Sequence, residues 1–512
     1  MQKNYFAIID IGSNTMRLVM YLQEKAGRLR EVENVKAVAR LRNHLNENGV
    51  LTEEGIHILL TTLKSFNEVI QTYKVSDLIC VATATIRQAN NQNDIQQMVR
   101  EQLGFDMRVL SEHEEAFYGY LAVVNSTSLT EGITVDIGGG STEVTYFKDR
   151  KLIESHSFPF GALTLKDFYK EDTPTNEELS KLRTFLIKEF QSLPWLKNKH
   201  VPLIGIGGSA RNLVQIDQNK KKYPLAGLHQ YKMQDSDIRQ ISQYLTGLPF
   251  DKLQKVEGLS KDRADIIIPA IEVFHCLYQT MLAESFILSR KGLRDGVFYE
   301  QLSQSLGSFL FPNVLEDSIQ ELINDFDLNP NQILHVQFLT RKLFQILQSN
   351  GFGPFKQADW ILLKRASFLF NLGEYIDSES SAQHTFYLIA NRTIDGLLHK
   401  ERLMIALVAS FRNKTIFKQF LHPYKEWFLK EEQKKLRRLG AILKFTYCLD
   451  ATKRQVIKDF DVNVSDKLIE INLYCRKDWM PEEYQAEKQK KHLEKALKKD
   501  ITLNFIRIET AQ

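Results

Sequence analysis

Two short segments of the sequence combine an aspartate, glycines and hydroxyl side chains in an order that suits phosphate binding. They are residues 10–15 (DIGSNT) and residues 136–142 (DIGGGST). Each follows an apolar run and precedes an alternating stretch, so each is predicted to be the tip of a β-hairpin. Glycines let backbone N–H groups approach phosphate oxygens, and a carboxylate at a strand end can hold a hydrated cation. The residues expected to contact phosphate are Gly12, Ser13, Asn14, Thr15, Gly138, Gly139, Gly140 and Ser141.

The repetition of the turn is more informative than either copy. A single Asp-x-Gly hairpin is usually structural, because both residues are common in tight turns. Two copies at a domain-like separation predict two matched lobes that hold a phosphate chain between them, with a Mg²⁺ or Mn²⁺ ion near Asp136 and Glu143.

A third glycine turn follows the apolar run at 201–204 and precedes a predicted helix. Its candidate phosphate contacts are Gly207, Gly208 and Ser209. The plainer interpretation is a tight strand-to-helix connection. The segment lacks both the lysine of a P-loop and the spacing of a dinucleotide fingerprint, so the sequence supports neither of these sites.

The segments around these turns carry a family resemblance. VATATIRQA at 81–89, LSEHEEA at 110–116, FPFGA at 158–162, KDRADII at 261–267 and GLRDG at 292–296 follow in that order. With the three turns, they resemble the motifs of the exopolyphosphatase and guanosine pentaphosphate phosphatase (Ppx/GppA) family, in the actin, Hsp70 and sugar kinase superfamily. The resemblance spans about residues 4–300 and implies two ribonuclease H-like domains.

The resemblance implies that Glu115 is the catalytic glutamate, which would orient and deprotonate the attacking water, with Glu114 in a supporting role. Acidic residues at the start of a helix are otherwise often present only to stabilise its dipole. Arg87, in the same segment as Thr83, is the expected phosphate clamp, because a guanidinium can bind two oxygens of one phosphoryl group. Its alternative is a salt bridge to Asp94.

Three further arginines belong to the same group of candidates. Strand alternation from Thr15 points Arg17 toward the first turn, where it would contact a terminal phosphate. Arg263 and Arg294 lie in family-like motifs, although each would equally suit a structural ion pair.

The amino-acid composition limits the classes of protein to which the chain can belong. A hydrophobic share of 43% and a charged share of 25% are those of an ordinary soluble globular protein. No apolar run approaches the ~20 residues of a membrane span, which predicts a cytoplasmic protein. The four cysteines lie far apart and indicate neither a zinc site nor disulfides. The net charge of +4 gives no argument for a nucleic-acid partner.

Four domains are predicted. Residues 1–125 and 126–305 each alternate strand and helix patterns, including a helix over 262–281, and are expected to be α/β. Residues 306–447 are mostly helical, and in long family members this region resembles HD phosphohydrolases. Here residues 368–373 (FLFNLG) place Phe and Asn where a metal-binding His-Asp pair would stand, leaving His384 alone, so no second metal-dependent active site is expected.

The last predicted domain, 448–512, is a small α/β module with a basic helix. The helix carries Lys488, Lys490, Lys491, Lys495 and Lys498. Such a run is commonly a solvated face, and the alternative is a track that captures a polyanionic substrate in a salt-sensitive way.

The favoured function is an exopolyphosphatase that releases orthophosphate processively from inorganic polyphosphate, with guanosine pentaphosphate (pppGpp) 5′-phosphohydrolase as the alternative. An actin-like ATPase or ATP-dependent kinase, or a noncatalytic alarmone sensor, are the competing classes. The Glu114-Glu115 pair argues against a kinase. The resemblance also suggests a homodimer.

Overall fold

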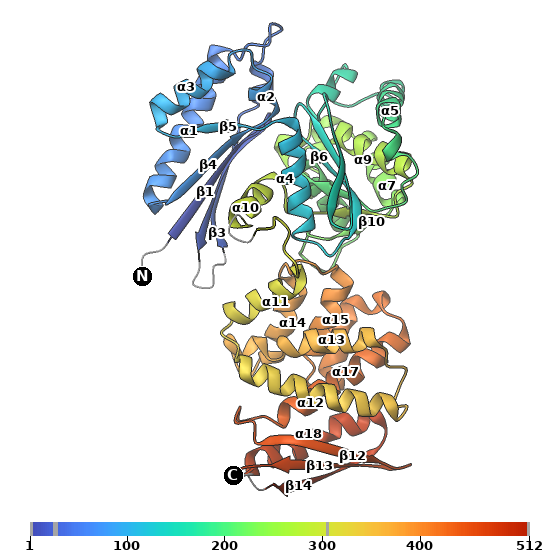
Figure 1. The fold of residues 1–512 in the computed structure, drawn as a ribbon. Helices are drawn as coiled ribbons and strands as arrows, with labels where there is room; N and C mark the ends of the chain where they lie inside the picture. Colours follow the sequence, from blue (N-terminus) through green and yellow to red (C-terminus); the bar gives the residue numbers. More distant parts are fainter. Residues whose placement is uncertain (1–3, 24–28, 304–306, 509–512) are drawn as a thin grey trace. The chain divides into compact units, whose positions relative to one another are not determined.

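The computed structural model describes residues 4–23, 29–303 and 307–508, and the chain divides into two compact units (Figure 1). The first comprises Met1–Tyr223 with Leu228–Val314, and the second Pro224–Gly227 with Leu315–Gln512. The α/β class is confirmed, as are a following helical region and a small C-terminal sheet. The finer division into four domains stays a prediction.

The first unit contains a five-stranded sheet of order β3-β2-β1-β4-β5. Its strands are β1 (Asn4–Ile11), β2 (Thr15–Gln23), β3 (Leu29–Val38), β4 (Asp77–Ala82) and β5 (Met107–Val109). Both faces of β1 are covered, because Ile9 joins the core under helices on one side while Ile8 packs with Tyr118 and Val297 on the other. This two-sided burial explains why the strand is a nearly continuous apolar run.

The second sheet of this unit has six strands in the order β10-β11-β9-β6-β7-β8. They are β6 (Glu131–Ile137), β7 (Thr142–Lys148), β8 (Lys151–Phe158), β9 (Leu203–Ile206), β10 (Lys232–Met233) and β11 (Phe286–Leu288). In each sheet an antiparallel three-strand meander joins a parallel strand at its first member: β4 beside β1, and β9 beside β6. The two predicted phosphate turns therefore occupy equivalent positions, between β1 and β2 and between β6 and β7.

Helices cover these sheets. Those described in the first unit are α1 (Glu53–Tyr73), α2 (Ala84–Arg87), α3 (Gln92–Leu103), α4 (Glu112–Val124), α5 (Asn176–Gln191), α6 (Gly207–Lys220), α7 (Asp235–Thr246), α8 (Phe250–Leu253), α9 (Ile267–Met281) and α10 (Leu293–Ser303). Helices α4 and α10 pack together, with α4 against the second sheet and α10 against β1 (Figure 1). The helix predicted over 262–281 begins later, since Lys261–Arg263 forms a separate 3-10 turn.

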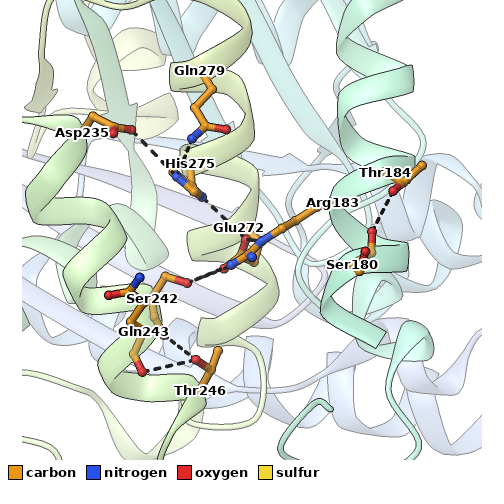
Figure 2. Close-up of polar contacts among 10 residues, drawn as sticks. All are labelled: Ser180, Arg183, Thr184, Asp235, Ser242, Gln243, Thr246, Glu272, His275 and Gln279. Carbon is orange, nitrogen blue, oxygen red and sulfur yellow. Dashed lines mark hydrogen bonds and ion pairs between the residues drawn. The ribbon is translucent and has the colours of Figure 1, made fainter. Parts of the chain in front are cut away.

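In the first unit, a buried ion pair connects helices α5, α7 and α9 (Figure 2). Arg183 of α5 donates to both carboxylate oxygens of Glu272 of α9, from Nε at 2.6 Å and from Nη2 at 3.0 Å. The Ser242 hydroxyl of α7 donates to the same carboxylate, and His275 lies on its far side. Every oxygen of this fully buried group is therefore paired, as a buried charge requires.

The second unit combines helices with a three-stranded sheet of order β12-β13-β14. Its elements are α11 (Val314–Asp325), α12 (Pro330–Ser349), α13 (Gln357–Phe368), α14 (Ser381–Asn391), α15 (His399–Ala409), α16 (Lys414–Leu421), α17 (Lys430–Cys448), β12 (Ile457–Val464), β13 (Leu468–Cys475), α18 (Met480–Leu497) and β14 (Asp500–Arg507). Helix α18 packs against α17 and β14. No helix of the described ranges is long and apolar enough to cross a bilayer.

Candidate active site

A cavity of about 140 Å³ in the first unit collects most of the predicted site residues. It is lined by both hairpin turns, by the glycine turn at the start of α6 and by the first turn of α4. The predicted residues on its wall are Gly12, Ser13, Asn14, Thr15, Arg17, Thr83, Glu115, Asp136, Gly138, Gly139, Ser141, Glu143, Gly207 and Gly208. Residues from five distant parts of the sequence thus face one space.

The two hairpin turns have the same internal hydrogen bond and touch each other. Gly12 N–H donates to the Thr15 carbonyl at 3.1 Å, and Gly138 N–H donates to the Ser141 carbonyl at 2.9 Å. A Cβ atom placed on Gly139 would lie 2.9 Å from Cβ of Ser13. Only a residue without a side chain fits there, so the glycine permits the direct approach of the two turns.

Asn14 supplies the clearest signal of a missing ligand. Its side chain is only 6% exposed, yet both its amide nitrogen and its oxygen are buried without a hydrogen-bond partner among the described residues. Buried polar atoms are almost always paired. An unpaired amide on the wall of a cavity therefore indicates that a polar ligand completes the site.

The glycine turn brings the start of α6 against Asp136. Gly207 has a φ of +81°, and a Cβ atom there would lie 2.4 Å from Oδ1 of Asp136. A Cβ on Gly208 would overlap the guanidinium of Arg263. The free N–H groups of the first helical turn thus face the cavity between a carboxylate and a cation, an arrangement suited to a metal-associated phosphate.

Glu115 lies at the start of α4, with a side chain 12% exposed. The Arg87 guanidinium donates to its Oε2 at 2.9 Å. Burial raises the pKa of Glu115 to about 7, although Arg87 acts in the opposite direction, and the nearby Asp136 and Asp10 raise it further. A carboxyl group that titrates near neutral pH is well matched to general-base chemistry.

Glu114 has a different setting from its neighbour. It is not on the cavity wall; it forms the capping box of α4 with Ser111 and an ion pair with Arg108. Partial burial acts to raise its pKa, but the hydrogen bonds from Arg108 and Ser111 outweigh burial and hold the pKa at about 2. These contacts give Glu114 the helix-stabilising role that acidic residues often have at this position.

Arg87 also lies off the cavity wall. Besides Glu115, its Nη1 donates to the Leu110 carbonyl at 2.8 Å. Among the described residues Arg87 forms an ion pair with Glu115, and not with Asp94. Gly140 and Ser209 stand just behind the lining residues: Gly140 lies beside the Ser13 hydroxyl, and Ser209 accepts a hydrogen bond from Arg263 at 3.3 Å.

The structure adds three lining residues that sequence reasoning did not select, namely Asp10, Arg211 and Arg290. Arg211 sits one helical turn after the glycine turn, and its Nε donates to the Gly207 carbonyl at 3.1 Å. This i to i+4 spacing was readable from the sequence. Arg263 and Arg294 also line the cavity, and Arg294 lies 3.5 Å from Asp10.

Five arginines therefore converge on a small volume: Arg17, Arg211, Arg263, Arg290 and Arg294. Burial, and then the neighbouring arginines Arg17, Arg294, Arg263 and Arg290, lower the pKa of Arg211 to about 10. Cations this close to one another repel, and a multiply charged anion between them would remove that cost. The electrostatics match a chain of phosphates.

The carboxylates of the cavity bear on metal binding. Burial, and then Asp10, raises the pKa of Asp136 to about 6, and burial followed by Glu115 raises that of Glu143. A cation beside them would offset this burial cost. In the described ranges no group of three or more His, Cys, Asp or Glu side chains could hold a metal. Mg²⁺ usually uses one or two carboxylates with waters and substrate phosphate, so this donor set fits it.

The predicted lysines lie on α18 in the second unit. Lys490 pairs with Glu487 at 2.8 Å, and Lys488 lies 5.7 Å above the Tyr484 ring. Lys491, Lys495 and Lys498 are exposed. Burial, and then Lys444, Lys491 and Lys495, lower the pKa of the intervening His492 to about 4. The helix also carries four glutamates, so its positive charge is limited to the face with the exposed lysines.

Similarity to known proteins identifies the family of the chain. The model of the Ppx/GppA phosphatase family matches residues 21–305, more than half of the chain. The chain belongs to the Ppx/GppA phosphatase family. Its domain III model matches residues 314–496. Members of the Ppx/GppA family hydrolyse phosphoanhydrides, and the resemblance first seen in the motifs is thereby confirmed.

Individual relatives support the same assignment. A guanosine-5′-triphosphate,3′-diphosphate pyrophosphatase of Pseudoalteromonas translucida is 26% identical over 492 residues, 94% of this chain and 93% of the relative. A Ppx/GppA family member from Aquifex aeolicus is 29% identical with a TM-score of 0.53, covering 60% of this chain and all of that one. An exopolyphosphatase from Cytophaga hutchinsonii, at 21% identity, has a TM-score of 0.54, covers 59% of this chain and 98% of that one, and shows the shared fold.

Proposed function

We propose that the protein is an exopolyphosphatase, which transfers the terminal phosphoryl group of inorganic polyphosphate to water. Water attacks the terminal phosphorus, the bridging oxygen leaves with the shortened chain, and orthophosphate is released. The observation that carries the proposal is Glu115, a carboxyl group with a pKa of about 7 on the wall of a cavity lined by arginines and glycine turns. Each turnover would remove one phosphate from the end of the chain.

Glu115 would act as the general base. Its carboxylate would accept the proton of the attacking water and hold that water in line with the bond to be broken. Arg87 contacts Glu115 and lies away from the wall, so it would act as a positioning residue that keeps part of Glu115 ionised near neutral pH. The sequence-based role of phosphate clamp passes instead to the five arginines that line the cavity.

The turns and arginines would stabilise the charge that builds on the phosphoryl oxygens. Backbone N–H groups of the two hairpin tips and of the start of α6 are fixed donors, which need no rearrangement during reaction. Asp136 and Glu143, with Asp10 on the same cavity wall, would hold a Mg²⁺ or Mn²⁺ ion. The cation would neutralise phosphate charge as in other phosphoryl transfers.

Two observations bear on the substrate. No aromatic side chain of the described residues lines this cavity, so the site offers phosphate contacts and no stacking surface for a base. The basic face of α18 suits a long polyanion. A pppGpp 5′-phosphohydrolase is the second candidate, because a relative that matches over nearly the whole chain is named a guanosine-5′-triphosphate,3′-diphosphate pyrophosphatase.

Phosphate release from polyphosphate, from pppGpp and from ATP with sugar acceptors would separate these functions. We expect release from polyphosphate to be the fastest and phosphate transfer from ATP to a sugar to be absent. Faster release from pppGpp than from polyphosphate at every chain length would replace the first candidate with the second. Binding of either compound without release would exclude an enzyme.

Charge reversal of Lys491 and Lys495 tests the polyanion track. We expect both reversals together to raise the KM for long polyphosphate at low salt, with little effect on tripolyphosphate, because screening shortens the reach of surface charges. Reversal of the exposed Lys252 and Lys255 of the first unit is the matched control. An equal change for short and long chains would contradict the track.

A further inference from the structure

A second cavity, of about 350 Å³, lies within the second unit and has a different character. It is bordered by the loop between α11 and α12, by the first half of α12, by the segment after α13 and by the end of α17. Its volume falls in the range of small-molecule sites. The function proposed above makes no use of it.

Aromatic rings form much of its wall. Phe326, Phe368, Phe370, Tyr375 and Tyr447 all line it. The rings of Phe370 and Tyr447 lie 4.6 Å apart, and Phe326 meets Tyr375 edge-on at 5.3 Å. Phe368 and Phe370 belong to the segment at 368–373, where the sequence predicted no metal-binding His-Asp pair. Their rings offer surfaces on which a flat ring can stack.

Polar groups converge on the same space. Asn371 Nδ2 donates to Oε1 of Glu374 at 2.7 Å, and Gln332 lies 3.5 Å from the Tyr447 hydroxyl. Among the described residues Glu374 forms no ion pair. The side chain that donates a hydrogen bond to its carboxylate is Asn371. A carboxylate held in orientation at an aromatic cavity is an acceptor for adjacent N–H groups of a ligand.

The backbone of the cavity is also unusual. Asp327, Asn371 and Lys453 line it with φ angles of 47°, 58° and 61°. Left-handed conformations at residues other than glycine cost free energy and tend to be kept at ligand sites. Three of them around one cavity, from three separate segments, indicate a wall shaped for binding rather than for packing alone.

We propose that this cavity binds a guanine nucleoside. The purine ring would stack on Phe370, and its N1–H and exocyclic amino group would donate to the carboxylate of Glu374. Guanine is the base that places two such donors side by side, whereas adenine offers one donor beside an acceptor. The amides of Asn371 and Gln332 and the Tyr447 hydroxyl would complete the polar contacts.

Equilibrium dialysis of the full-length protein with guanosine tests this proposal, because guanosine lacks the phosphates that the active-site cavity holds. We expect saturable binding of guanosine, weaker binding of inosine, which lacks the amino group, and weaker binding still of adenosine. Glu115→Gln should leave guanosine binding unchanged. Absence of saturable guanosine binding, or equal binding of adenosine, would overturn the proposal.

Variants of the wall locate the ligand. Glu374 is exposed, so Glu374→Gln should leave folding intact and weaken guanosine binding at least about tenfold, the usual effect of losing hydrogen bonds to a charged group. Phe370→Ala should weaken it about tenfold through lost stacking. The controls are Glu426→Gln and Phe338→Ala, which change exposed residues of the same unit outside the cavity. Unchanged binding in Glu374→Gln would refute the assignment.

Discussion

Two buried glutamates of the first unit, Glu115 and Glu272, show how surroundings decide what a carboxyl group does. Burial acts to raise the pKa of both. At Glu272 the His275 ring, 3.8 Å away, and the hydrogen bonds from Arg183 and Ser242 overcome burial and hold the pKa at about 2 (Figure 2). Glu115 has one arginine, and two carboxylates lie near it, so its pKa rises to about 7.

The difference teaches that hydrogen-bond donors, and not burial, separate a carboxylate that stays ionised from one that titrates near neutral pH. Glu272 is satisfied on both oxygens, so it stays ionised and joins three helices. Glu115 keeps enough proton affinity to accept a proton from water. Identical substitutions at the two positions should therefore have opposite consequences for activity and stability.

The largest expected effect is on catalysis. Glu115→Gln keeps the shape of the side chain but removes the base, so phosphate release should fall at least ~10²-fold while substrate still binds. Steady-state phosphate release and the KM measure this. The free energy of unfolding should stay the same or rise, because a poorly solvated charge is gone. A variant that retains full activity would show that another group activates the water.

Glu272→Gln is the matched substitution at the structural site. It should lower the free energy of unfolding by about 2 kcal/mol, because hydrogen bonds to charged groups are weakened and Arg183 loses its counter-charge. The activity per folded molecule should change less than about twofold. Urea denaturation and phosphate release measure the two quantities, and a large loss of activity with normal stability would contradict the separation of roles.

Arg87→Met removes the cation that lowers the pKa of Glu115. The acidic limb of the kcat profile, expected near pH 7 in the unaltered protein, should move to higher pH because more of the glutamate is protonated. The KM should change little, since Arg87 does not line the cavity. Arg108→Met, which unpairs Glu114, is the control and should leave the limb in place. A raised KM with an unmoved limb would favour the phosphate clamp predicted from the sequence.

The smallest expected effect is the pH dependence of stability. The folded protein raises the pKa of Glu115, so it binds the proton more tightly than the unfolded chain, and stability should fall as pH rises from about 4.5 through 7. Glu272 has a lowered pKa, so its contribution is present above about pH 4.5 and is lost as pH falls toward 2. Denaturation at pH 6.5 and pH 8 should show a smaller difference for Glu115→Gln than for the unaltered protein, by roughly 1 kcal/mol.

The sequence predicts local turns and motifs better than it predicts which distant side chains meet at the candidate site. The hairpin tips at residues 10–15 and 136–142 were predicted from the apolar runs and turn residues around them, because local sequence dictates such turns. The glycine turns and Glu115 were found through motifs. The structure pairs Arg87 with Glu115 and not with Asp94, because tertiary packing brings α4 beside Arg87, and the role of Arg87 as a phosphate clamp stays a prediction. Asp10 belongs to the first predicted turn and Arg211 follows the glycine turn by one helical turn, so both could have been selected, whereas Arg290 reaches the cavity through tertiary arrangement.

The contact between the hairpin tips at Gly139 and Ser13 has a consequence for adaptation. The gap at this point is set on one side by main chain alone, because Gly139 has no side chain that could be shortened, while Cβ of Ser13 and Cδ1 of Leu163 face it from the other side. A methyl group at position 139 would push the two turns apart, and no residue smaller than glycine exists for this position. We therefore expect natural variants to keep the same separation between the two turns. A preference for bulkier or longer molecules would have to evolve on surfaces outside this contact.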